Sequence, residues 1–135
     1  MYREDHTRLI ILIVEDVAET RDGIENLLKA DGYRVAVARD ERDAIESARR
    51  EQPNLILVSL AGLPSEVIAT ARRIREHAGL GNQVPVVIFC VESIDEGDDL
   101  GIGENVHISR PDNFNQLRRL LARLLREAPL VPLAA

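Results

Sequence analysis

Five short runs that can each form a strand, separated by helical or turn patterns, restrict the fold of this sequence more than any other feature. The first run, residues 9–14, is continuous and rich in β-branched residues, with no alternation of apolar and polar positions. Such a run is typical of a strand that is covered on both faces, as strands are in a parallel sheet. The other runs are residues 33–38, 55–58, 84–89 and 105–108. We therefore predict five strands of one buried sheet.

Helical patterns lie between most of these strands. Apolar positions at helical spacing predict helices over residues 18–30, 40–51 and 65–76. The clearest pattern follows residue 112, where leucines recur with the spacing of an amphipathic helix: Leu117, Leu120, Leu121, Leu124 and Leu125. Residues 92–103 differ, because five acidic residues and three glycines predict at most a short, weakly held helix there.

The alternation of strands and helices predicts an α/β fold. We expect a doubly wound, five-stranded parallel sheet with helices on both faces, in a (βα)5 order. At roughly 100–200 residues per domain, the 135 residues make one domain. We place this domain at residues 8–127, between an N-terminal extension of residues 1–7 and a C-terminal tail of residues 128–135. With no room for a second domain, we expect any output to act through contact with a partner.

The composition disfavours several classes of protein. A net charge of −6 argues against a general nucleic-acid binder, because the phosphate backbone attracts basic surfaces. The N-terminus is charged and the longest apolar run is residues 9–14, so we expect neither a signal peptide nor a membrane span. Cys90 is the only cysteine, which rules out an internal disulfide and fits a reducing cytoplasm.

The carboxyl ends of the predicted strands carry the candidate functional residues. In doubly wound sheets, ligands bind outside these ends, at the point where the strand order reverses. The residues at or near the predicted strand ends are Glu15, Asp16, Ser59, Cys90, His107 and Arg110. We therefore look for the chemistry of this chain among these six side chains.

The strand ends stand within a wider sequence pattern. It includes residues 11–16, which end in the acidic pair Glu15 and Asp16. Its other parts are Arg21 and residues 32–33, 53–58, 85–88 and 110–111. This pattern resembles the receiver domain of two-component response regulators over about residues 8–127. The resemblance implies a flavodoxin-like fold and a Mg²⁺ site at the acidic pair. In that family, an aspartate after the third strand accepts a phosphoryl group from a histidine kinase. A Thr or Ser and a Lys of the family contact the phosphoryl oxygens.

The sequence departs from that family's pattern around the acceptor. Glu15 and Asp16 match the acidic pair, but Ser59 stands at the acceptor position, Cys90 at the Thr/Ser position and Arg110 at the Lys position. Ser59 brings no negative charge, and no histidine base is predicted beside it. We therefore expect weak or vestigial Mg²⁺ binding at Glu15 and Asp16 and no aspartyl phosphorylation. A salt bridge from Arg110 to the acidic pair would imitate the neutralised site.

These departures lead to one interpretation and two alternatives. We interpret the chain as a stand-alone, atypical receiver that is not an enzyme. It would act as a phosphorylation-independent interaction module in bacterial signalling, with a histidine kinase or a downstream effector as partner. The first alternative is an acceptor modified at another residue, such as Ser59 by a serine kinase. The second is a binder of a small polar ligand in the strand-end crevice.

Two further features concern switching and docking. His107 stands where many receivers carry a switch aromatic, and the alternative is a half-exposed strand histidine. The last helix bears arginines on its outer flank, beside the acidic stretch 92–99: Arg118, Arg119, Arg123 and Arg126. In the family this face is a frequent site of dimerisation and partner docking. Stripes of opposite charge predict a homodimer here, with a solvated amphipathic helix as the alternative.

Overall fold

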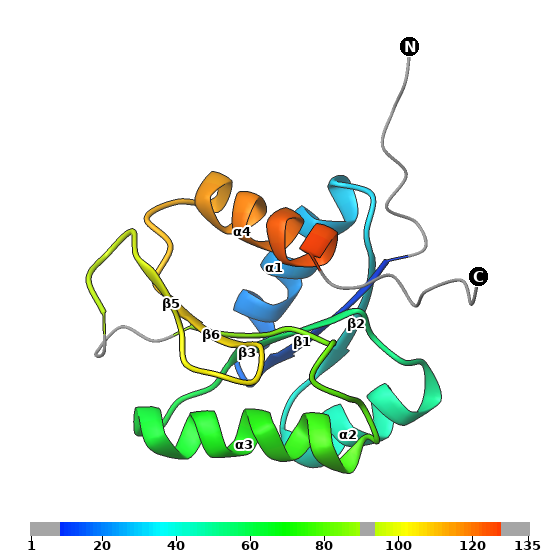
Figure 1. The fold of residues 1–135 in the computed structure, drawn as a ribbon. Helices are drawn as coiled ribbons and strands as arrows, with labels where there is room; N and C mark the ends of the chain where they lie inside the picture. Colours follow the sequence, from blue (N-terminus) through cyan, green and yellow to red (C-terminus); the bar gives the residue numbers. More distant parts are fainter. Residues whose placement is uncertain (1–8, 90–93, 128–135) are drawn as a thin grey trace, which may run out of the picture.

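The computed structural model describes residues 9–89 and 94–127 and contains one mixed sheet between two layers of helices (Figure 1). The strands are β1 (Ile10–Glu15), β2 (Arg34–Ala38), β3 (Leu55–Ser59), β4 (Val86–Phe89), β5 (Asp99–Gly101) and β6 (Val106–Ser109). The helices are α1 (Ala18–Ala30), α2 (Glu41–Arg50), α3 (Pro64–His77) and α4 (Phe114–Glu127). The predicted N-terminal extension and C-terminal tail lie outside the described residues.

The sheet has the order β2-β1-β3-β4-β6-β5. Neighbouring strands among β2, β1, β3, β4 and β6 are parallel, which confirms the five predicted strands and the flavodoxin-like α/β fold. The helices cover both faces: α1 and α4 lie on one side and α2 and α3 on the other (Figure 1). None of the described helices is long and apolar enough to cross a bilayer.

The predicted five-stranded sheet and (βα)5 order are corrected in one segment. Between β4 and β6, the described residues form no helix but a sixth strand, β5, which pairs antiparallel with β6. Gly97 and Gly103 have φ values of 90° and 102°, which a helix does not allow. Glu104 and Asn105, with φ values of 56° and 61°, then reverse the chain tightly into β6. The local glycines and this turn therefore favour a hairpin over the weak helix.

The central strands are buried on both faces, which explains their uninterrupted apolar sequences. In β1, Leu12 and Val14 join the core under α2 and α3, whereas Ile11 and Ile13 join the core under α1 and α4. The five leucines predicted to form the inner face of the last helix are all buried against this second core. Alternate side chains of one strand thus anchor two opposite helix layers.

A buried arginine fixes α3 to the edge of the sheet that carries the β5–β6 hairpin. Arg75 is 4% exposed, and its Nη1 donates to the carbonyl of Val84 at 3.0 Å and of Asn105 at 3.5 Å. Burial lowers the pKa of this guanidinium. Because it binds residues just before β4 and β6, Arg75 helps to hold the start of both strands against α3.

Two neighbouring leucines on α1 test how much burial in the core contributes to the free energy of unfolding. Leu28 is fully buried, whereas Leu27 is 44% exposed. Leu28→Ala should reduce the free energy of unfolding by about 2–5 kcal/mol, because it removes buried apolar contacts and leaves a cavity. Leu27→Ala is the matched control and should cost less than about 1 kcal/mol in urea unfolding followed by circular dichroism. Equal losses from the two variants would contradict the placement of α1.

The ion pair between α2 and α3 predicts a pH-dependent stability. Arg73 Nε and Nη2 donate to the two carboxylate oxygens of Glu41, each at 2.9 Å, and this hydrogen bonding lowers the pKa of Glu41. A lowered folded-state pKa gives stability that is present above the unfolded pKa and is lost as pH falls through the folded one. Arg73→Gln should therefore reduce the free energy of unfolding at neutral pH, by a small amount because both side chains are partly exposed.

The difference between wild type and Arg73→Gln should close below about pH 4. Arg42→Gln serves as control, since the Arg42 side chain is 90% exposed and its pair with Glu46 at 3.5 Å lies within one helix. A difference that keeps its size into acid would mean that Arg73 acts through packing rather than through the Glu41 carboxylate.

Candidate functional site

The carboxyl ends of β1 and β3 meet at one point of the sheet. Glu15, the last residue of β1, is the register partner of Ser59, the last residue of β3. From here the chain turns to opposite faces, because α1 follows β1 on one side and α3 follows β3 on the other (Figure 1). The sequence-predicted residues Glu15, Asp16 and Ser59 thus lie together at the switch in strand order, where doubly wound folds place their sites.

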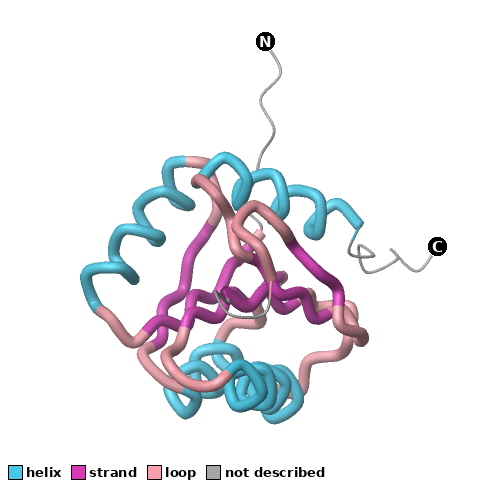
Figure 2. The backbone as a smooth tube through the Cα atoms, turned by 90° about the vertical axis from the view of Figure 1, so that its left-hand side faces the viewer, coloured by secondary structure: helices cyan, strands magenta, loops and turns pink. Residues whose placement is uncertain are grey.

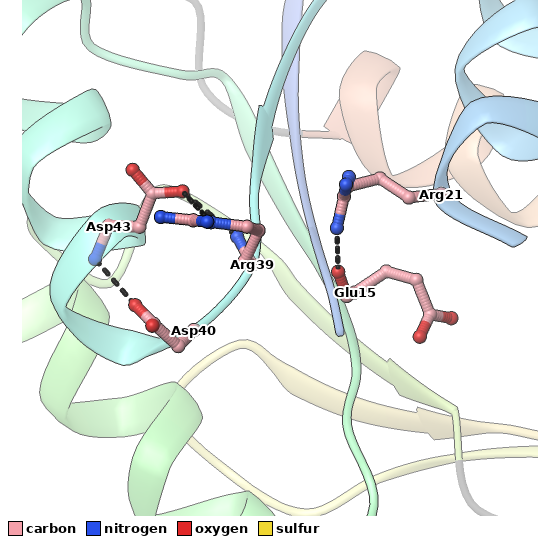
Figure 3. A network of polar contacts seen from close by, with 5 residues as sticks. All are labelled: Glu15, Arg21, Arg39, Asp40 and Asp43. Carbon is pink, nitrogen blue, oxygen red and sulfur yellow. Dashed lines mark hydrogen bonds and ion pairs between the residues drawn. The ribbon is translucent and has the colours of Figure 1, made fainter. Parts of the chain in front are cut away.

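The Glu15 carboxylate is turned back toward its own chain. Glu15 is 4% exposed, and its Oε2 accepts a hydrogen bond from the backbone N–H of Val17 at 3.0 Å. Arg21 Nη1 donates to the backbone carbonyl of Glu15 at 2.9 Å, and Figure 3 shows the carboxylate pointing away from this guanidinium. Asp16, by contrast, is exposed. Only one of the two acidic side chains therefore faces solvent.

Ser59 has no activating partner in the part of the chain that the structure describes. Its side chain is half-buried at the end of β3. No described histidine or carboxylate makes a hydrogen bond to its hydroxyl, and a serine nucleophile needs such a base to lose its proton. Cys90, which follows β4, lies outside the described residues, so its predicted place at the strand end, in the Thr/Ser position of the family, stays a prediction.

Arg110 is held by the loop before β5 rather than by the acidic pair. Its Nη1 donates to the Ile94 carbonyl at 3.3 Å, and its backbone N–H donates to the Asp98 carbonyl at 3.0 Å. Among the described residues it forms no ion pair with Glu15 or Asp16. The reason is distance, since β1 and β6 are three strand spacings apart, or about 14 Å. The neutralising salt bridge considered from the sequence is therefore not formed here.

A pair of carboxyl groups lies beside Arg110 and was not singled out from the sequence. Hydrogen bonding to Asp112 and its negative charge raise the pKa of the exposed Glu96 carboxyl, whereas the nearby Arg110 lowers it. Gln116 Nε2 donates to the Gly97 carbonyl at 3.1 Å, which ties the same loop to α4. Sequence spacing gives little signal for this group, because the loop and the helix meet only in the folded chain.

Two exposed apolar residues, here called the apolar rim, stand at the starts of the helices that follow β1 and β3. Val17 is the N-cap of α1 and Leu63 the N-cap of α3, and neither makes a side-chain capping bond. They are 53% and 60% exposed. An apolar N-cap in place of Ser, Thr, Asp or Asn costs about 1 kcal/mol of stability. Such a departure from a local rule, at both helices that follow the site strands, is typical of a functional surface.

The donors at this edge do not fit the Mg²⁺ site that the acidic pair implied. In the described residues no three His, Cys, Asp or Glu side chains lie close enough to hold a metal ion. Glu15 is hydrogen-bonded to Val17, and its register partner is a serine rather than a third carboxylate. Of positions 15, 16 and 59, only Asp16 therefore presents a solvent-exposed carboxylate.

His107 lies away from this edge. It stands within β6 between Val87 of β4 and Gly101 of β5, and its ring Nε2 is 2.8 Å from Asn105 Oδ1. Its side chain is half-buried. The structure therefore places His107 in the sheet beside the added strand and does not bring it to Glu15 or Ser59.

The four arginines of the last helix divide into two groups. Arg118 Nε donates to Asp31 at 2.8 Å and its guanidinium lies 4.9 Å from the centre of the Phe114 ring, so this side chain joins α4 to the end of α1. The other three, Arg119, Arg123 and Arg126, line a hollow next to β5. One arginine of the charged stripe expected from the sequence, Arg118, thus makes contacts within the molecule.

The model of the response regulator receiver domain family matches residues 11–125 of this chain. The chain belongs to this family. Among solved structures, the receiver domain of sensor histidine kinase PA1611 from Pseudomonas aeruginosa PAO1, which holds a magnesium ion in its active site cleft, is 27% identical. The similarity has a TM-score of 0.64 and covers 88% of this chain and 98% of that one. Vibrio cholerae chemotaxis protein CheY4 shares the fold at 20% identity, with a TM-score of 0.65 over 86% of this chain and 98% of that one.

The curated relatives of this receiver domain are longer proteins. Sensor histidine kinase AruS of Pseudomonas aeruginosa is 30% identical over 134 residues, and transcriptional regulatory protein ZraR of Escherichia coli K12 is 29% identical over 122 residues. These alignments cover 94% and 89% of this chain but only 13% and 27% of the relatives. The similarity therefore concerns only a small part of each relative.

The register of Glu15 and Ser59 predicts how metal binding responds to a single substitution. The wild-type receiver should bind Mg²⁺ weakly in calorimetric titration, whereas Ser59→Asp should bind it several-fold more tightly, because the substitution places a third carboxylate beside Glu15. Ser59→Asn is the matched control, of the same size but neutral, and should stay as weak as wild type. Tight binding by the wild-type protein would contradict this account of the donors.

Proposed function

We propose that this chain is a cytoplasmic, non-enzymatic receiver domain that acts in two-component signalling as a protein-interaction module without aspartyl phosphorylation. Its partner would be a histidine kinase or a downstream effector. The observation that carries the proposal is Ser59 at the end of β3, directly opposite Glu15. We infer that Ser59 occupies the position of the family's phosphoryl-accepting aspartate. A serine cannot form an acyl phosphate.

The surroundings of Ser59 support the loss of phosphoryl transfer. An aspartate acceptor attacks as a carboxylate, which is already deprotonated at neutral pH. A serine hydroxyl needs a base, and the described residues offer Ser59 none in hydrogen-bonding contact. The nearest acidic neighbour in register, Glu15, already accepts the Val17 N–H. Among the described residues, this position thus offers neither an acceptor carboxylate at Ser59 nor a base in contact with its hydroxyl.

The apolar rim supports a role in binding. Val17 and Leu63 flank the site and are more than half exposed, so a partner that covers them removes apolar surface from water. A partner can use this surface whether or not the site beneath it is phosphorylated. The hollows described beside α4 and on α2 do not include the strand-end residues, so they do not bear on the small-ligand alternative.

A homodimer through α4 and the edge of the sheet stays a prediction. Arg118 and Arg123 already pair with Asp31 and Asp99 within one molecule, at 2.8 and 3.5 Å. A charged-stripe dimer would have to use the remaining arginines. Sedimentation at low and high salt distinguishes a dimer that dissociates as salt rises from a monomer at all salt concentrations.

Incubation with acetyl phosphate and Mg²⁺ tests the proposed function. We expect no mass increase of one phosphoryl group on the wild-type chain in intact mass spectrometry, because Ser59 is neither acidic nor activated. Ser59→Asp is the comparison that restores a carboxylate at the same place, and a mass gain in this variant alone would assign the loss of acceptance to Ser59.

Two results would count against the proposal. A base-labile acyl phosphate on Asp16, or on another carboxylate of the wild-type protein, would show that the receiver still accepts phosphoryl groups. Phosphoserine at Ser59 in protein isolated from its host would favour the alternative, in which a serine kinase modifies this residue.

A further inference from the structure

The added strand β5 creates a hollow between the edge of the sheet and α4. The hollow has a volume of about 480 Å³ and is lined by Asp99 of β5 and by Gln116, Arg119, Leu120, Ala122, Arg123 and Arg126 of α4. Figure 2 views the molecule from the side on which β5 lies in Figure 1. Leu120 and Ala122 are the apolar residues of this lining, and three of its seven residues are arginines.

The charge of this hollow is opposite to that of the whole chain. Arg123 pairs with Asp99 at 3.5 Å, so the single carboxylate of the lining is offset. Arg119 and Arg126 are exposed, and within residues 9–89 and 94–127 neither forms an ion pair. The chain carries a net charge of −6. The hollow is thus a local positive site that would attract an anionic group of a partner.

The edge of β5 beside the hollow also offers hydrogen-bonding groups. Arg110 N–H donates to the Asp98 carbonyl at 3.0 Å and Ile102 N–H to the Val106 carbonyl at 2.9 Å, so positions 98 and 102 bond toward β6. Antiparallel pairing alternates, and the backbone N–H and C=O of Asp99 and Gly101 consequently point away from β6. No described strand pairs with this side of β5, which ends the sheet.

We propose that an extended acidic segment of a partner protein docks here, adding to the edge of β5 as a further strand with its carboxylates on Arg119 and Arg126. Side chains at alternate positions of an added strand face α4, as Asp99 does, and are about 7 Å apart. The helix rises about 6 Å between Arg119 and Arg123 and about 10 Å between Arg119 and Arg126. The spacing of Arg119 and Arg126 thus falls between the two-residue and the four-residue steps of an extended chain, and their long, flexible side chains can take up the difference to meet carboxylates that face α4.

This inference rests on the proposed function, since it names a kind of partner for the interaction module. Strand addition supplies main-chain hydrogen bonds, and the arginines supply selectivity for acidic sequences. A neutral strand would gain only the few main-chain bonds of the three-residue β5, which is too short to bind strongly alone.

The test uses the full chain and a dye-labelled peptide of alternating Glu and Val residues, with fluorescence anisotropy as the measurement. We expect saturable binding that weakens as salt rises, and no binding of the matching Lys and Val peptide. Arg119→Glu and Arg126→Glu should each weaken binding about tenfold or more. Arg50→Glu, the same change at an exposed position on α2, should leave the affinity unchanged.

A second pair of measurements separates strand addition from simple attraction of anions. Gly101→Pro removes an outward N–H that makes no bond to β6, so it should weaken binding of the peptide but not of tripolyphosphate. Should this variant fail to fold by circular dichroism, a peptide N-methylated at alternate residues provides the same test on the wild-type protein, and its binding should be lost.

Four results would overturn the inference: no binding of the acidic peptide, unchanged binding by the two arginine variants, equal binding of the N-methylated peptide, or occupation of the edge by a second copy that excludes the peptide. The last result would appear as self-association in sedimentation. None of them alters the outcome with acetyl phosphate, so a failure of this inference is distinguishable from a failure of the proposed function.

Discussion

Burial of β1 and β3 on both faces is the constraint on which the rest of this structure depends. Their alternate side chains are needed by two cores at once, so a shift of register by one residue would place every side chain against the wrong helix layer. This fixed register sets Glu15 opposite Ser59. The packing of β1 and β3 between the two helix layers thus determines that Glu15 and Ser59 lie opposite each other.

The sheet edge shows how a receiver domain can change its surface without changing its core. In place of a helix after β4, the described residues form the short strand β5, held to β6 and to the start of α4 by backbone bonds and by Gln116. The parallel part of the sheet keeps its order, β2-β1-β3-β4-β6. The change instead exposes a strand edge next to a row of arginines, which is the surface where we propose that an acidic segment docks.

Sequence patterns predicted the parallel strands, the helices and the inner face of α4 because each depends on local apolar spacing. They did not predict β5, since its three exposed residues bury little and its pairing is decided by glycine conformations and a tight turn. The strand-end position of Glu15, Asp16 and Ser59 was predictable from topology alone. The engagement of Arg110 with Ile94 and the apolar N-caps Val17 and Leu63 became visible only in the folded chain.

The sequence by itself determined the family, the buried strands and the serine at the end of the third strand, because these depend on the order of residues within short segments. Only the tertiary structure decided which charges meet. It paired Arg118 with Asp31 and Arg123 with Asp99, kept Arg110 from the acidic pair, and left Arg119 and Arg126 facing a hollow. The physical reason is that ion pairs form over a few ångströms between segments far apart in sequence, so their partners follow from packing rather than from spacing.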